Sequence, residues 1–124
     1  MADTTALMWT FSAKAKPSQE IISILMPGEE ILQCYQTIRD QAALTNKRII
    51  VMDKQGLTGK KVEIYSLPYR SIDMWSSENA GKLLDFNSEL ELWTKAGRIK
   101  INLSPKCDIR EFDRILGNAI LENH

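Results

Sequence analysis

The chain has 124 residues, of which 44% are apolar and 26% are charged. This composition is typical of one soluble globular domain with a single core and excludes a disordered protein. Sixteen basic residues balance 16 acidic ones, so net charge gives no general attraction to nucleic acid or to an anionic membrane.

The first residues lack the basic and apolar regions of a signal peptide, and we expect no leader. No apolar run approaches the ~20 residues of a membrane-spanning helix. Cys34 and Cys107 are the only cysteines. Two distant cysteines without an export signal predict reduced thiols and a cytoplasmic protein.

The first 26 residues predict an arm and a short helix. Residues 1–17 carry Trp9 and Phe11 among small and polar residues, and we interpret them as an arm before the domain that packing partly orders. The domain then spans residues 18–124 and begins with a short helix over 18–26, for which Ser18 is the expected N-cap.

Residues 29–103 predict a run of short antiparallel strands. The stretch 49–52 is apolar on both faces, which favours a central, covered strand. A turn is expected at 45–48, and the two glycines within 53–61 predict a loop. The other strands are expected at 30–39, 42–45, 62–67 and 72–77.

The clearest hairpin joins 88–93 to 98–103, because both arms alternate strictly. Its expected register places apolar pairs on the inner face and polar or aromatic pairs on the outer face. The inner pairs are Leu92 with Ile99 and Leu90 with Ile101, and the outer pairs are Glu91 with Lys100 and Trp93 with Arg98.

The C-terminal segment 108–121 predicts one amphipathic helix. Asp108, with Glu111 three residues later, resembles a capping box. Apolar residues follow at helical spacing and indicate a core-facing stripe. The stripe comprises Ile109, Phe112, Ile115, Leu116, Ala119 and Ile120. A helix after a run of strands indicates a mainly β sandwich or barrel plugged by that helix.

Catalytic and metal-binding patterns are missing from the sequence. The one histidine, His124, is the last residue, which argues against a nucleophile–histidine arrangement. A zinc site requires clustered Cys and His residues, and the sequence contains no such cluster. We therefore expect no enzyme, no metal site and no cofactor. The scattered acids are interpreted as solvated surface and include Glu29, Glu30, Asp40, Asp53, Glu63, Asp73 and Asp85.

The lysine-containing stretch 54–61 departs from a phosphate-binding loop. Only two residues separate Gly56 from Gly59, and Lys61 stands where that loop has Ser or Thr. Its backbone N–H groups and three lysines still permit anion binding. A solvated connection between strands and an anion-binding loop both stay open.

Several short segments together resemble the bacterial pleckstrin-homology-like (PH-like) domain family. The likeness covers roughly residues 20–121, nearly the whole predicted domain. The matching segments are LMPGEE at 25–30, RD at 39–40, TNKR at 45–48, DKQGLTGKK at 53–61, SLPYRSI at 66–72, NAG at 79–81 and ELELW at 89–93.

The resemblance implies a split barrel of two near-orthogonal antiparallel sheets, with seven strands and a capping C-terminal helix. It implies a small cytoplasmic protein of the single-domain kind that forms a closed ring of identical copies, with five members expected. A hydrophilic surface where strands of neighbouring copies meet is the protein-binding surface that the resemblance implies.

Lipid binding is not carried over from eukaryotic PH domains. Those domains use several basic residues around the first strand turn, whereas the corresponding turn here, 38–41, has one arginine, Arg39, beside Asp40. Likeness of fold alone is a weak argument for function.

Our first hypothesis is a non-catalytic interaction module that binds its own copies and an unidentified protein, with neither nucleic acid nor a membrane as partner. The alternative is a peripheral binder of an anionic lipid headgroup or a nucleotide through loop 54–61, together with Lys47 and Arg48. The expected contact residues are Arg39, Asp40, Asn46, Lys47, Arg48, Lys54, Gln55, Lys60 and Lys61. For Asn46, turn formation is the stronger interpretation.

Overall fold

Eight strands and one long helix account for most of the described residues. The computed structural model describes residues 5–58, 60–80 and 87–124, so Gly59 of the lysine loop and Gly81 of the 79–81 segment lie outside the described residues. The elements are β1 (Thr5–Ala15), α1 (Gln19–Ser23), β2 (Ile31–Thr37), β3 (Gln41–Thr45), β4 (Arg48–Gln55), β5 (Lys61–Pro68), η1 (Tyr69–Ser71), β6 (Ile72–Glu78), β7 (Ser88–Thr94), β8 (Gly97–Leu103) and α2 (Ile109–Glu122).

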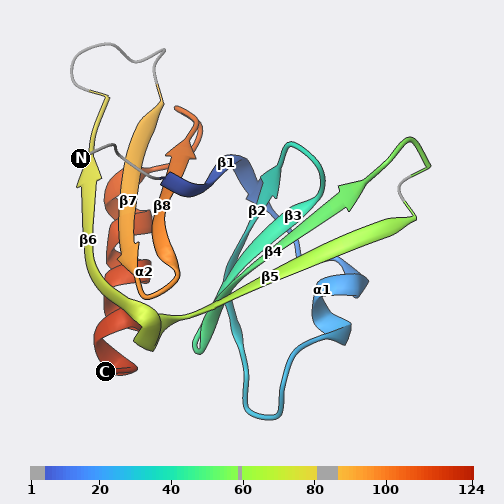
Figure 1. Ribbon diagram of the computed structural model, residues 1–124, viewed down its shortest axis with the longest axis horizontal. Coiled ribbons are helices and arrows are strands. Elements are labelled where there is room, and N and C mark those ends of the chain that lie inside the picture. The colour runs from blue at the N-terminus through green and yellow to red at the C-terminus, as the bar shows by residue number, and fades with distance from the viewer. Residues whose placement is uncertain (1–4, 59, 81–86) are drawn as a thin grey trace.

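Hydrogen bonds join all eight strands into one sheet in the order β5-β4-β3-β2-β1-β8-β7-β6. The sheet curls, so that β2–β5 and β6–β8 form two halves, with α2 covering the second half (Figure 1). The mainly β architecture with a C-terminal helix is confirmed. The described residues form eight strands, one more than predicted, and the additional strand is β1.

The predicted N-terminal arm is wrong, because β1 is an internal strand that joins the two halves. It pairs in parallel with β8 and antiparallel with β2. Trp9 and Phe11 are buried in the core, and the Phe11 ring stacks on Tyr35 and contacts Phe112. Buried Trp9 and Phe11 alternate with the more exposed Met8, Thr10 and Ser12, which is the burial pattern of a strand with one face on the core.

The predicted hairpin and helix are confirmed. Strands β7 and β8 pair Leu92 with Ile99 and Glu91 with Lys100, as expected. The Arg98 guanidinium carbon lies 5.7 Å from the Trp93 ring centroid. In α2, Asp108 caps the first turn by accepting hydrogen bonds from two backbone N–H groups, and the buried stripe comprises Phe112, Leu116, Ala119 and Ile120.

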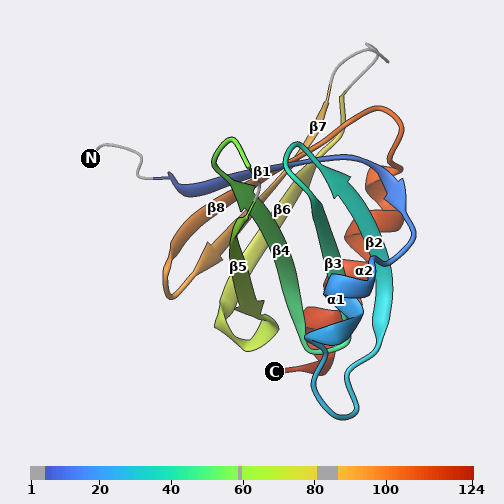
Figure 2. The ribbon, with the colours of Figure 1, turned by 90° about the vertical axis from the view of Figure 1, so that its right-hand side faces the viewer.

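A second, smaller core lies on the outer face of the first half. Figure 2 shows α1 in front of this half. Its Ile21 packs with a buried group from β2, β3 and β4 that comprises Cys34, Ala43, Ile50 and Met52. Ser18 caps α1 as predicted, although the helix ends at Ser23, before the expected residue 26. The expected loop 53–61 is also shorter, because ladder pairing of β4 with β5 extends to Gln55 and Lys61.

Candidate functional site

The nine predicted contact residues lie at opposite ends of β3 and β4. These strands form an antiparallel pair in which Ala42 lies opposite Val51. The turn before β3 therefore lies beside the end of β4 and the β4–β5 loop. This end carries Arg39, Asp40, Lys54, Gln55, Lys60 and Lys61, whereas the other end carries Asn46, Lys47 and Arg48.

At the second end, Arg48 forms a structural ion pair with Glu29. Its Nε and Nη2 atoms donate to the two carboxylate oxygens over 2.9 and 3.0 Å. The same guanidinium donates to the Ile24 carbonyl and to the Ser66 hydroxyl. The Arg48 side chain is 14% exposed and that of Glu29 is fully buried. Arg48 therefore has a structural role, because its guanidinium bonds within the protein. The prediction that Glu29 lies on a solvated surface is wrong.

The environment of Glu29 strongly favours its charged form. Burial opposes ionisation, but hydrogen bonds from Arg48, the Met26 N–H and the Thr45 hydroxyl, together with the Arg48 charge, lower its pKa to about 2. The Thr45 hydroxyl donates to Glu29 Oε2 over 2.7 Å. We call Glu29, Arg48 and Thr45 the buried clamp.

Asn46 and Lys47 also hold the turn region together. The Asn46 side chain accepts from the Glu30 N–H and donates to the Gly28 carbonyl. Lys47 Nζ donates to the Pro27 carbonyl over 3.4 Å. Asn46 therefore has the turn-forming role that sequence reasoning favoured for it, although its backbone φ is not positive.

At the first end, two of the basic residues have acidic neighbours. Lys54 Nζ lies 3.6 Å from Glu20, and Arg39 Nε lies 3.6 Å from Asp53. Among the described residues, no carboxylate lies within ion-pair distance of the exposed Lys60 and Lys61. Burial raises the pKa of Asp40. The positive charge of Lys54 opposes this rise, and the negative charge of Glu20 adds to it.

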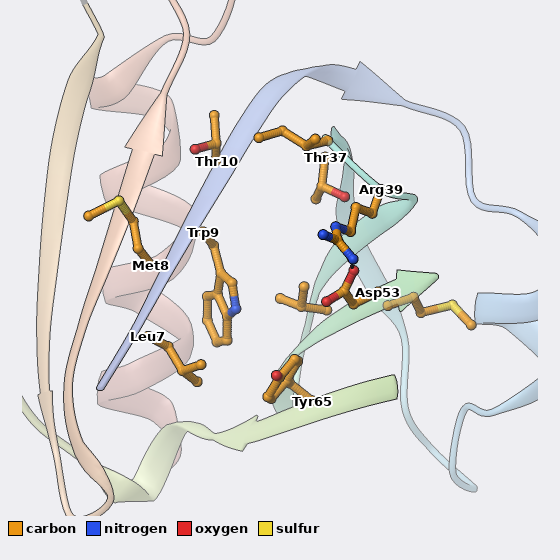
Figure 3. A pocket seen from close by; sticks show the side chains of 11 residues that line it. Leu7, Met8, Trp9, Thr10, Thr37, Arg39, Asp53 and Tyr65 are labelled. Atoms are coloured by element: carbon orange, nitrogen blue, oxygen red, sulfur yellow. Dashed lines mark ion pairs between the residues drawn. The ribbon is translucent and has the colours of Figure 1, made fainter. Parts of the chain in front are cut away.

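A groove that sequence reasoning missed opens beside this end. Its volume is about 520 Å³, and it lies between β1, the β2–β3 turn, β4 and β5. In Figure 3 the rings of Trp9 and Tyr65 lie on its apolar side; their centroids are 6.1 Å apart and the planes are inclined by 56°. The remaining lining residues are Leu7, Met8, Thr10, Thr37, Ile38, Arg39, Val51, Met52 and Asp53.

The ion pair of Arg39 and Asp53 supplies the charged end of the groove (Figure 3). The Arg39 side chain is 59% exposed, whereas that of Asp53 is 26% exposed. Asp53 Oδ1 is buried and accepts no hydrogen bond within the described part of the chain. Of the nine predicted contact residues, only Arg39 lines this groove.

The described residues contain neither a metal-binding cluster nor a membrane-spanning helix. No group of three or more His, Cys, Asp or Glu side chains in residues 5–58, 60–80 and 87–124 could hold a metal ion. Over the same ranges, no helix combines the length and the apolar character needed to cross a membrane.

Comparison with known proteins identifies relatives along nearly the whole chain. The family model described as "Bacterial PH domain" matches residues 3–120. The chain is 41% identical over 85 residues to the uncharacterized protein YjqA of Bacillus subtilis, covering 68% of this chain and 67% of that protein. It is 29% identical over 104 residues to the uncharacterized protein YozO of the same organism, covering 84% and 90%.

Two crystal structures from Shewanella share this fold at 34% sequence identity. One is a DUF1696 family protein with a pleckstrin-homology domain from Shewanella loihica, with a TM-score of 0.77 over 87% of this chain and 96% of that chain. The other is a pleckstrin homology domain from Shewanella amazonensis, with a TM-score of 0.64 over 82% of each chain. The PH-like fold that the sequence predicted is thereby confirmed.

Proposed function

The chain belongs to the bacterial PH domain family, and from this premise we propose that it is a non-catalytic, cytoplasmic interaction module that assembles into a closed ring of identical copies and binds a protein partner. The observation that carries the ring is a sheet with two different open edges, β5 and β6. The five-membered size is the expectation that the family resemblance supplies.

Both edges offer backbone and apolar groups for strand-to-strand association. Within the described residues, β5 pairs only with β4 and β6 only with β7. An edge strand presents unpaired N–H and C=O groups with which another strand can form hydrogen bonds. Val62 and Ile64 on β5 are 39% and 42% exposed, and Met74 on β6 is 53% exposed. Contact between the edges of two copies would remove these side chains from water.

The difference between the edges favours a ring over a two-fold dimer. If β5 of one copy meets β6 of the next, each copy uses two distinct surfaces, and the contact is heterologous. Such contacts generate a ring when the rotation between neighbours closes. The protein-binding role is supported by family membership and by a groove that is separate from the buried clamp.

The ring is tested by measuring the molar mass of the full chain in solution by light scattering after size-exclusion chromatography. We expect a mass near five times the 14.1 kDa of one chain. The double variant Val62→Lys/Ile64→Lys should reduce the mass, because burying two ammonium groups at an interface opposes association.

Leu121→Lys is the matched control, because Leu121 is also an exposed apolar residue, at 68%, but lies on α2 and not on either edge strand. It should leave the mass unchanged. A monomer at tens of micromolar for the unmodified chain, or equal loss of mass in both variants, would refute the proposed assembly through the edges.

A further inference from the structure

Strand β1 changes partners partway along its length, and this leaves part of one backbone edge open. On one side, Leu7 to Phe11 pair with Ile99 to Leu103 of β8. On the other side, pairing with β2 begins only at Phe11, which lies opposite Thr37. In the described part of the chain, no strand pairs with the second side of Leu7–Trp9, and this open side borders the groove.

The direction of the free backbone groups follows from one hydrogen bond. The Phe11 carbonyl accepts from the Ser104 N–H, just beyond β8, so the backbone groups of Phe11 point toward β8. Because these directions alternate along a strand, Trp9 and Leu7 also bond toward β8. The N–H and C=O of Met8 therefore point the other way, toward the groove.

The groove has an apolar wall beside this edge. Leu7, Trp9 and Val51 line it, and the Tyr65 ring packs against that of Trp9 on the same side. Figure 3 shows the indole nitrogen of Trp9 on the groove side of its ring. The volume of about 520 Å³ lies within the range of about 300–1,000 Å³ that binding pockets usually have.

At the charged end of the groove, beside Asp53, Arg39 presents a guanidinium with N–H donors that are not used in hydrogen bonds among the described residues. A guanidinium has five N–H donors, and the contact of Arg39 Nε with Asp53 Oδ1 at 3.6 Å is longer than a hydrogen bond. Since its side chain is 59% exposed, an incoming carboxylate can reach the guanidinium without displacing protein groups.

We propose that this groove binds an extended peptide segment of a partner protein by strand addition to β1. The peptide backbone bonds to the N–H and C=O of Met8, an apolar side chain packs against Trp9 and Tyr65, and an acidic side chain pairs with Arg39. Strand addition takes affinity from backbone bonds and specificity from alternate side chains. An apolar residue followed two positions later by an acid would place both side chains on the same face.

This inference rests on the proposed role as an interaction module, but it uses the interior edge at β1 and not the outer edges at β5 and β6. The two can therefore fail separately. Loss of the ring leaves peptide binding in place if the groove acts alone, and absence of peptide binding leaves the measured molar mass unchanged.

The test begins with selection of peptides from a phage-displayed library of random short peptides on the full chain. The selected peptide is then synthesised, and its affinity is measured by fluorescence anisotropy. We expect selected sequences to share the apolar–acidic spacing and Arg39→Glu to weaken binding by about tenfold or more. Lys61→Glu is the matched control, because it makes the same charge change outside the groove, and it should alter affinity less than about twofold.

Amide hydrogen exchange measured by NMR then reports the backbone contact directly. The Met8 amide should exchange slowly only when the peptide is bound, because peptide binding supplies its missing acceptor. Failure to enrich any peptide, unchanged exchange at Met8 in the complex, or equal weakening by Arg39→Glu and Lys61→Glu would each overturn the proposal. Arg39 is exposed, and circular dichroism of its variant should match that of the unmodified protein.

Discussion

The buried clamp makes a quantitative prediction about acid stability. Folding lowers the pKa of Glu29 from 4.5 to about 2. One pKa unit corresponds to about 1.4 kcal/mol, so the ionised carboxylate contributes roughly 3 kcal/mol to the free energy of unfolding at neutral pH. The Glu29 side chain is fully buried, so solvent screening reduces this contribution little. Glu29→Gln should destabilise the protein by about this amount at pH 7, because Arg48 then loses its counter-charge.

The direction of the pH dependence follows from the sign of the shift. Between the folded pKa of about 2 and the unfolded value of 4.5, the unfolded chain binds more protons at Glu29 than the folded chain does. The Glu29 contribution is therefore present in full above the unfolded pKa and is lost as the pH falls toward the folded pKa. The stability difference between the unmodified protein and Glu29→Gln should shrink across this window.

Urea unfolding, followed by tryptophan fluorescence at one protein concentration, measures this difference at several pH values. Glu30→Gln is the matched control, because Glu30 is exposed and its link to Asn46 runs through the backbone N–H. It should change the free energy of unfolding by less than about 0.5 kcal/mol. A Glu29→Gln deficit that stays constant from pH 7 down to the folded pKa would refute the electrostatic role of the clamp.

Two further predictions concern the helix and the lysine loop. Phe112→Ala should cost about 3–5 kcal/mol, because the ring is fully buried against Phe11 and Tyr35; an unchanged urea midpoint would mean that α2 does not seal the core. Cosedimentation with phosphatidylserine vesicles should show weak, salt-insensitive association, because 16 acidic residues balance the 16 basic ones. Strong binding at low salt that disappears in a Lys54, Lys60, Lys61 triple-alanine variant would favour the anion-binding alternative.

The elements that the sequence predicted correctly are those whose pattern is local. The β7–β8 register follows from strict alternation over a short hairpin, and apolar and charged pairs agree on it. Helix α2 follows from a repeat of three and four residues with an N-cap at Asp108. In both cases the pattern that predicts the element lies within that element or within two consecutive ones, even though the core partners of α2, such as Phe11 and Tyr35, lie far away along the chain.

The buried clamp could not be predicted from the sequence, because its residues are separated along the chain. Carboxylates are rarely buried unless they are paired, so Glu29 alone predicts a solvated side chain. Its partner Arg48 lies 19 residues later, on the far side of a hairpin. The order of the two segments gives no indication that the turn before β2 and the start of β4 meet.

The free edge of β1 shows why the groove was also beyond prediction. The apolar residues of this segment, Trp9 and Phe11, are consistent with an arm that packs loosely or with a strand, and only the contact of Phe11 with Tyr35 and Phe112 decides between them. The opening then depends on where β1 exchanges β8 for β2 as its neighbour. That position is set by the curl of the whole sheet, so a binding edge in the interior of the fold arises from tertiary structure and leaves no local motif.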